Sequence, residues 1–148
     1  MIRLARQDDL DALMEIWLEA NLQAHDFLPA AYWQSNAVSV RRQLPQAQVY
    51  VYESEDGAAE GFLGLIDSYI AGLFVRSRSQ SRGVGRQLLR FAQDIWPALS
   101  LHVYEKNRRA VRFYQRGGFR IQQEQLDSDT GQREYAMVWQ AKALPSQP

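Results

Sequence analysis

Residues 80–89 read Q-S-R-G-V-G-R-Q-L-L and place a glycine turn directly before an amphipathic segment. A short apolar run, residues 70–75, precedes the turn, so the predicted order is strand, glycine turn, helix. Backbone N–H groups and the positive end of a helix dipole meet at such a turn and bind anions without a dedicated side chain. Gly83 and Gly85 lack the Cβ atoms that would keep phosphate oxygens from those amides. The spacing therefore predicts a pyrophosphate-binding turn.

Two other phosphate-binding motifs do not fit these residues. A dinucleotide fingerprint has a third glycine three residues after the second, and that position is Leu88. A P-loop needs Gly-Lys followed by Ser or Thr, which the chain lacks.

A second motif follows the next apolar run, residues 99–103. Residues 107–119 read N-R-R-A-V-R-F-Y-Q-R-G-G-F. Together the two segments resemble the signatures of the GNAT N-acetyltransferase superfamily, Q/R-x-x-G-x-G/A and N-x-x-A-x-x-x-Y-x-x-x-G-F, at the expected separation. The resemblance covers nearly the whole chain, and the second half is similar to ribosomal-protein alanine acetyltransferases. Two signatures in register are far more specific than either alone.

The resemblance implies one α/β (α+β) domain over residues 1–142. Its sheet would be mixed and mostly antiparallel, with six or seven strands flanked by about four helices, and the strands ending at Val75 and Val103 would splay to form the acyl-CoA cleft. The implied reaction is direct acetyl transfer from acetyl-CoA to a primary amine, on a protein lysine, a protein N-terminus or a small molecule, without a metal. The alternative is a non-catalytic acyl-CoA-binding regulator.

By the same resemblance, the strand main chain, the turn and the second motif bind acetyl-CoA. The residues concerned are Leu73, Phe74, Val75, Gln80, Ser81, Arg82, Gly83, Val84, Gly85, Arg86, Asn107 and Phe113. Tyr114 matches the family's tyrosine that gives a proton to the departing thiolate. Asn107 and Tyr114 are expected to face one cleft, because their spacing places them on one helix face. The alternatives are a core role for Tyr114 and N-capping by Asn107.

The general base is left open by the sequence, because residues 70–75 contain no carboxylate. Similar enzymes have Leu-Glu-Val five residues before the motif asparagine, where this chain has Leu-His-Val. An imidazole is a competent base at neutral pH, so His102 is the candidate, against a structural strand histidine. His25 is the rival. It lies in the loop where the family usually forms its acceptor-binding wall, here with Phe27, Tyr32 and Trp33. Asp67 and Glu105 are outside candidates, expected to be solvated.

The composition fits a single domain of 148 residues, of which 46% are hydrophobic. The absence of cysteine excludes disulfides, thiolate metal sites and cysteine nucleophiles. The apolar runs are too short to span a bilayer, and charged residues occupy the N-terminus where a signal peptide needs an apolar core. We therefore expect a cytoplasmic protein without a membrane or nucleic-acid partner, as a monomer or homodimer.

The formal net charge of zero hides an uneven distribution. Residues 76–120 hold eleven basic and two acidic residues, a net charge of +9, so the rest of the chain carries −9. The basic block coincides with both glycine motifs and suits the phosphates of coenzyme A. The alternatives are solvated helix faces and, less well supported, nucleic-acid binding, because the block lacks interleaved aromatic residues.

Periodicity and breaker residues predict the remaining elements. A strand is expected at residues 2–5, a helix that Asp8 and Asp9 cap and that ends near residues 21–24, and a second helix at 30–44. Paired strands follow at 48–53 and 61–66, a helix at about 83–95, and a final hairpin of strands 119–126 and 133–140. Gly117 and Gly118 are expected to end the helix of the second motif, and residues 143–148 to form a flexible tail.

Overall fold

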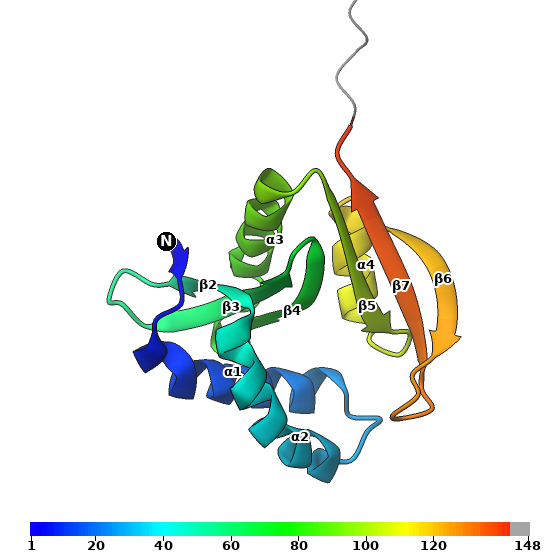
Figure 1. Ribbon diagram of the computed structural model, residues 1–148, viewed down its shortest axis with the longest axis horizontal. Coiled ribbons are helices and arrows are strands. Elements are labelled where there is room, and N and C mark those ends of the chain that lie inside the picture. The colour runs from blue at the N-terminus through cyan, green and yellow to red at the C-terminus, as the bar shows by residue number, and fades with distance from the viewer. Residues whose placement is uncertain (143–148) are drawn as a thin grey trace, which may run out of the picture.

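The computed structural model describes residues 1–142 and contains a mixed seven-stranded sheet with four α-helices (Figure 1). The strands are β1 (Ile2–Leu4), β2 (Gln48–Glu53), β3 (Ala59–Ile66), β4 (Tyr69–Val75), β5 (Ala98–Tyr104), β6 (Arg120–Leu126) and β7 (Arg133–Gln140). The helices are α1 (Leu10–Ala24), α2 (Ala30–Gln43), α3 (Val84–Ile95) and α4 (Arg108–Arg116). The predicted fold class is confirmed, whereas the predicted tail, residues 143–148, lies outside the described residues.

The sheet has the order β1-β2-β3-β4-β5-β7-β6. All neighbouring strands are antiparallel except β4 and β5, which are parallel. Parallel strands need a long crossover, and here α3 provides it. This one parallel pair joins the N-terminal and C-terminal parts of the sheet.

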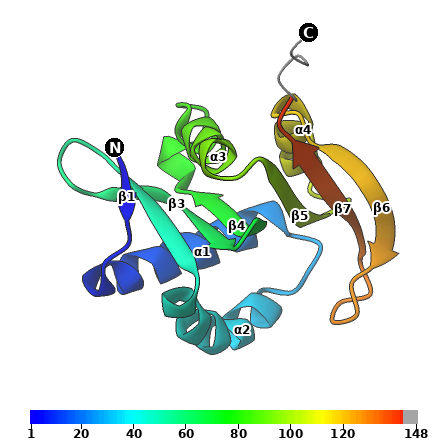
Figure 2. The ribbon, with the colours of Figure 1, turned by 45° about the horizontal axis from the view of Figure 1, so that its top comes forward.

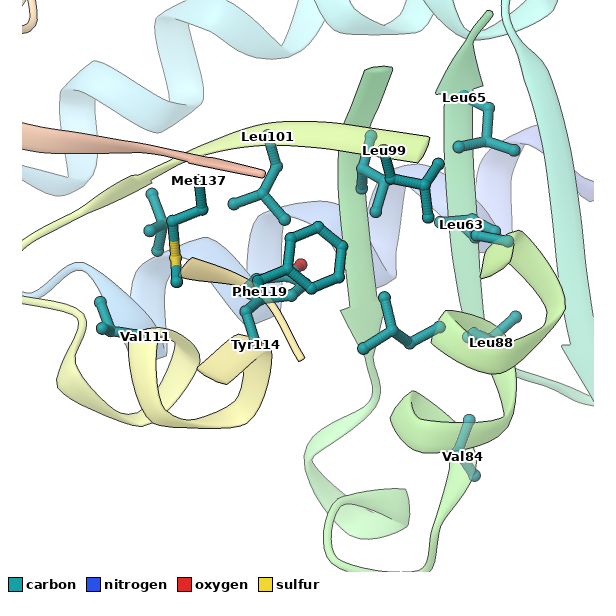
Figure 3. Close-up of a cluster of buried hydrophobic side chains, with 14 residues drawn as sticks. Leu63, Leu65, Val84, Leu88, Leu99, Leu101, Val111, Tyr114, Phe119 and Met137 are labelled. Carbon is teal, nitrogen blue, oxygen red and sulfur yellow. The ribbon is translucent and has the colours of Figure 1, made fainter. Parts of the chain in front are cut away.

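The two faces of the sheet carry different helices. On one face, α1 and α2 bury Leu13, Ile16 and Trp33 against β2 and β3. On the other face, α3 and α4 pack over a second apolar cluster, shown in Figure 3. That cluster includes Leu63, Leu65, Leu88, Leu99, Leu101, Val111, Tyr114, Phe119 and Met137. On the α1–α2 face, no helix of residues 1–142 lies over β7 and β6 (Figure 2).

Two helix ends differ from the simplest sequence prediction. Asp9 precedes α1, but its side chain forms no N-cap hydrogen bond. Its carboxylate instead accepts hydrogen bonds from Arg3 at 2.8 Å and from the Arg6 backbone N–H at 2.6 Å, which ties β1 to the start of α1. After α4, Gly118 has φ of +97° and takes the left-handed position, whereas Gly117 does not.

Candidate active site

The strands β4 and β5 separate after a single register pair, Tyr69 with Ser100. Figures 1 and 2 show β4 and β5 diverging. On the side of β4 that faces β3, the N–H of Arg76 donates to the Glu60 carbonyl at 2.8 Å. Along an antiparallel pair of strands, residues that bond to the neighbouring strand alternate with residues that do not. Counting back from Arg76, the main-chain groups of Leu73 and Val75 point away from β3. They therefore face the splay between β4 and β5.

Phe74 is the exception among the three predicted strand residues. It pairs with Phe62, and the same alternation directs its main-chain groups toward β3. Its ring also packs against Phe62, with centroids 5.2 Å apart, on the α1 side of the sheet. Leu73 and Val75 thus offer peptide groups to a ligand in the splay, and Phe74 does not.

The glycine turn lies between β4 and α3. Gly83 is the N-cap of α3 with φ of +84°, a conformation that glycine adopts without strain. Gly85 lies in the first turn of α3, where a Cβ would sit 3.4 Å from the Phe113 ring and 3.6 Å from the Val75 side chain. The first N–H groups of α3, including that of Val84, have no intrahelical partner. This turn therefore fits a diphosphate, with Phe113 forming one wall.

Arg109 of α4 holds the turn from across the splay. Its guanidinium donates to Gln80 Oε1 at 2.8 Å and to Ser81 Oγ at 3.3 Å. The amide of Gln80 in turn donates to the Val75 carbonyl at 3.3 Å. The turn, the end of β4 and α4 are therefore joined by one chain of hydrogen bonds.

Arg82 and Arg86 add positive charge at the same place. Both are exposed, and neither forms an ion pair within residues 1–142. Arg76, which begins the basic block, is neutralised by Glu15 at 2.9 Å. Arg82 and Arg86 thus leave two positive charges unpaired at the glycine turn, where an anion would use them.

Tyr114 lies on α4 among the side chains of Figure 3 and is 8% exposed. Its ring contacts Phe113 and Phe119 edge to face, with centroids 5.1 and 5.5 Å away. Its hydroxyl forms no hydrogen bond within residues 1–142, yet it is not among the fully buried polar atoms that lack a partner there. Burial raises the pKa of Tyr114 above its ordinary value, so the phenol stays protonated at neutral pH.

His25 and Asn107 lie in one chain of hydrogen bonds. Asn21 Nδ2 donates to the Trp17 carbonyl at 2.8 Å, so its Oδ1 accepts from His25 Nδ1 at 3.0 Å. Asn107 caps α4 by accepting the Ala110 N–H, so its Nδ2 donates to His25 Nε2 at 3.1 Å. Both ring nitrogens of His25 are therefore occupied by protein groups.

The environment of His25 also favours its neutral form. The ring stacks on Trp33 with centroids 5.1 Å apart and contacts Tyr104 edge to face. Burial lowers the pKa of His25 from 6.5 to about 4, although Asp26 acts in the opposite direction. This histidine is neutral at physiological pH.

His102 lies on the opposite sheet face from Tyr114. Leu101 and Val103 are buried under α4, so alternation along β5 turns His102 to the α1–α2 face, where it is exposed. Its Nδ1 lies 2.8 Å from the hydroxyl of Tyr69, at the start of the splay. The two other candidates are less suited: Asp67 is exposed in the turn before β4, and Glu105 accepts the Tyr135 hydroxyl at 3.3 Å.

The predicted acceptor wall is only partly at the surface. Phe27 and Tyr32 are half-buried beside Tyr104, whereas Trp33 is 8% exposed and belongs to the core under α2. Tyr104 donates a hydrogen bond to Asp127 Oδ2 at 2.6 Å, which links β5 to the β6–β7 loop. Aromatic side chains from the α1–α2 loop and from β5 thus meet at the wide end of the splay.

Sequence reasoning missed Tyr69, Arg109 and Tyr104. Arg109 lies inside the second motif. Its spacing of five residues from Tyr114 could have indicated that the two side chains leave α4 in different directions. Tyr69 gave no signal, because its orientation depends on a bulge in β4 that the sequence pattern does not indicate.

A family model described as "Acetyltransferase (GNAT) domain" matches residues 45–121, which include both glycine motifs. The peptidyl-lysine N-acetyltransferase YiaC of Escherichia coli K12 is 37% identical over 141 residues, covering 94% of this chain and 96% of YiaC. The chain belongs to the GNAT acetyltransferase family. It is thus an N-acetyltransferase, and acetyl-CoA is the donor used by this family, as the resemblance implied.

Solved GNAT structures have the same fold. Apo YjaB from Escherichia coli superposes with a TM-score of 0.86 at 29% identity, covering 96% of this chain and 98% of that one. The Salmonella typhimurium protein yncA, solved with its cofactor acetyl-CoA, has a TM-score of 0.68 at 19% identity, with coverage of 100% and 97%. The ribosomal-protein-S18-alanine N-acetyltransferase of Escherichia coli has a TM-score of 0.69 at 20% identity, with coverage of 100% and 98%.

None of the described helices is long and apolar enough to cross a membrane. No group of three or more His, Asp or Glu side chains in this part of the chain is arranged to hold a metal ion.

Proposed function

We propose that this GNAT enzyme acetylates lysine side chains of proteins or peptides. The observation that carries the proposal is the splay between β4 and β5, with the glycine turn at its end and Tyr114 and His102 on opposite sheet faces. The lysine acceptor is supported by YiaC, which is named a peptidyl-lysine N-acetyltransferase.

The donor would be held mainly by main-chain groups. The free amides at the start of α3 would bind the diphosphate, with Arg82, Arg86 and Arg109 supplying positive charge. The peptide groups of Leu73 and Val75 would bind the pantetheine arm in the manner of a neighbouring strand. Acetyl-CoA supplies an acetyl group activated as a thioester, whose leaving group is a thiolate.

Two proton transfers accompany the reaction. As the amine nitrogen bonds to the acetyl carbon, it must lose a proton, and His102 Nε2 on the acceptor face would take it. As the carbon–sulfur bond breaks, the thiolate must gain a proton, and Tyr114 would donate it from the α4 face. The raised pKa of Tyr114 keeps that proton in place until the thiolate forms.

His25 would act differently from His102. Its Nε2 lone pair accepts the Asn107 amide, so taking a proton there would cost a hydrogen bond at the α4 N-cap. Its lowered pKa also makes it a weak base at neutral pH. We assign it a structural role beneath the acceptor wall.

The acceptor would enter at the wide end of the splay. Phe27, Tyr32 and Tyr104 provide apolar surface for the alkyl chain of a lysine, and the chain outside residues 76–120 carries a net charge of −9. Both features suit a cationic side chain.

The test is an acetylation panel read by mass spectrometry. It contains a lysine peptide with a blocked N-terminus, a lysine-free peptide with N-terminal alanine, a polyamine and an aminoglycoside. We expect one added acetyl group on the blocked lysine peptide and much slower reaction of the others. Preferred acetylation of another member would overturn the lysine assignment. Calorimetric binding of acetyl-CoA without acetylation of any member would also overturn the lysine assignment.

A further inference from the structure

Tyr69 and His102 form a side-chain contact across the first part of the splay. The Tyr69 hydroxyl lies 2.8 Å from His102 Nδ1, and the ring centroids are 5.6 Å apart. Tyr69 is half-buried at the start of β4, whereas His102 is exposed on β5. The contact therefore links two strands whose backbones share only one register pair.

A bulge in β4 places Tyr69 on this face. The β3–β4 register steps from Gly64 with Gly72 to Leu65 with Ile70, so Ala71 is the extra residue. Strict alternation from Leu73 would turn Tyr69 toward α3, into the core. Because Ala71 is inserted, Ile70 enters the core and Tyr69 turns to the face of His102.

Few other ionisable groups surround His102. On β7, alternation puts Glu134 on the same face, and Gln125 donates to its carboxylate at 2.8 Å. On β5 itself the next residue on that face is Tyr104, whose hydroxyl donates to Asp127. The α1–α2 side brings His25, which contacts Tyr104. Within residues 1–142, the one side-chain hydrogen bond of His102 is the bond to Tyr69.

We propose that Tyr69 is a positioning residue that fixes the tautomer of His102. The Tyr69 oxygen accepts the Nδ1–H, which leaves the Nε2 lone pair free on the acceptor face. This inference rests on the proposed role of His102 as the general base. When Nε2 takes the amine's proton, the ring becomes an imidazolium whose Nδ1–H still donates to Tyr69. The opposite arrangement, with the hydroxyl donating to Nδ1, would place a proton on Nε2 and block that role.

The tautomer can be measured without catalysis. Long-range ¹H–¹⁵N correlation NMR distinguishes Nδ1–H from Nε2–H, and the chain has only two histidines, so His102→Gln assigns the signals. With the ring neutral, we expect His102 in the Nδ1–H form, and a shift to the Nε2–H form in Tyr69→Phe. Finding the Nε2–H form in the wild-type protein would overturn the proposal.

Kinetics supply a second readout. In Tyr69→Phe we expect kcat to fall by about fivefold to tenfold, with the KM for acetyl-CoA unchanged, because only the base is disturbed. In a plot of kcat/KM against pH, the limb at acidic pH should move to lower pH in Tyr69→Phe. The reason is that this variant loses a hydrogen bond that favours the charged His102 ring. A limb that moves to higher pH would show that the hydroxyl donates to Nδ1 and would refute the assignment.

The matched control is Tyr135→Phe. In the wild-type protein the Tyr135 hydroxyl donates to Glu105, on the opposite sheet face from His102. We expect the control variant to leave the tautomer, kcat and the acidic limb unchanged. An equal change in this control would overturn the specific role of Tyr69. If the tautomer behaves as expected but no amine is acetylated, the positioning inference stands and the proposed function fails.

Discussion

At the scale of single residues, the proposed proton donor and the proposed base are separated by the sheet itself. Tyr114 lies under the α4 side and His102 on the α1–α2 side, with the splay between them. The two groups therefore do not touch. Acid and base can act on opposite sides of a carbonyl carbon held in the splay.

Replacing Tyr114 by Phe should lower kcat by about 100-fold, the scale of one positioned general acid. The affinity for acetyl-CoA should change little, because the lost hydroxyl makes no hydrogen bond within the described residues. Stopped-time acetylation assays give kcat, and calorimetry gives the affinity. Since the ring is retained, the melting temperature should stay close to that of the wild type. A parallel fall in stability and activity would indicate that Tyr114 acts by packing alone.

At the scale of elements, the donor site is assembled from two helices that meet through Arg109. The guanidinium of this α4 residue organises the β4–α3 turn through Gln80 and Ser81. We expect Arg109→Ala to weaken acetyl-CoA binding by about tenfold and to leave kcat at saturation nearly unchanged. Isothermal titration calorimetry measures the affinity. Arg112→Ala removes the same charge from the next turn of α4, where the side chain forms no hydrogen bond to the β4–α3 turn within residues 1–142. An equal loss there would indicate a general field effect.

The first turn of α3 offers a second test of the donor site. Gly85→Asp places a carboxylate between Val75 and Phe113, where the diphosphate is proposed to bind. Acetyl-CoA affinity should fall by at least about 100-fold through repulsion between like charges. The fold should survive, since an acidic residue near a helix N-terminus is favourable. Gly85→Ala, which adds only the Cβ, should bind far better than Gly85→Asp. Unchanged acetyl-CoA binding in Gly85→Asp would contradict the proposed diphosphate site at this turn.

Most elements and both motifs could be predicted because their signals are local in the sequence. The glycine turn, the cap at Asn107 and the final hairpin each depend on a few neighbouring residues. Orientation within the sheet could not be predicted in the same way. The main chain of Phe74 faces β3 because of the register, and Tyr69 faces His102 because of a bulge. Both depend on pairing between strands, which a single sequence does not specify.

At the scale of the whole molecule, His25 connects two parts of the chain that the splay separates. Through Asn21 it is bonded to α1, and through Asn107 to the start of α4. The bond from Asn107 requires the neutral ring with its proton on Nδ1, because a protonated Nε2 cannot accept from an amide N–H. Protonation of His25 should therefore loosen the contact between the two parts of the sheet.

The pH dependence of stability should report this connection. The folded-state pKa of His25 is about 4, below its ordinary value of 6.5, so the unfolded chain binds more protons between these values. Stability should thus fall as pH decreases from about 6.5 to about 4, by no more than about 3 kcal/mol from this group. Urea unfolding at several pH values should show a smaller loss in His25→Gln than in the wild type. Identical pH dependence in both proteins would contradict the lowered pKa.

The ladder of β4 has an uneven set of hydrogen bonds, and this should be visible in amide hydrogen exchange. The N–H groups of Gly72 and Phe74 point toward β3, whereas those of Leu73 and Val75 point into the splay. Slow and fast amides should therefore alternate along a strand at the centre of the molecule, where uniform protection would be the ordinary expectation. Acetyl-CoA, by supplying acceptors on the open side, should slow the fast pair and make β4 exchange as a fully paired strand.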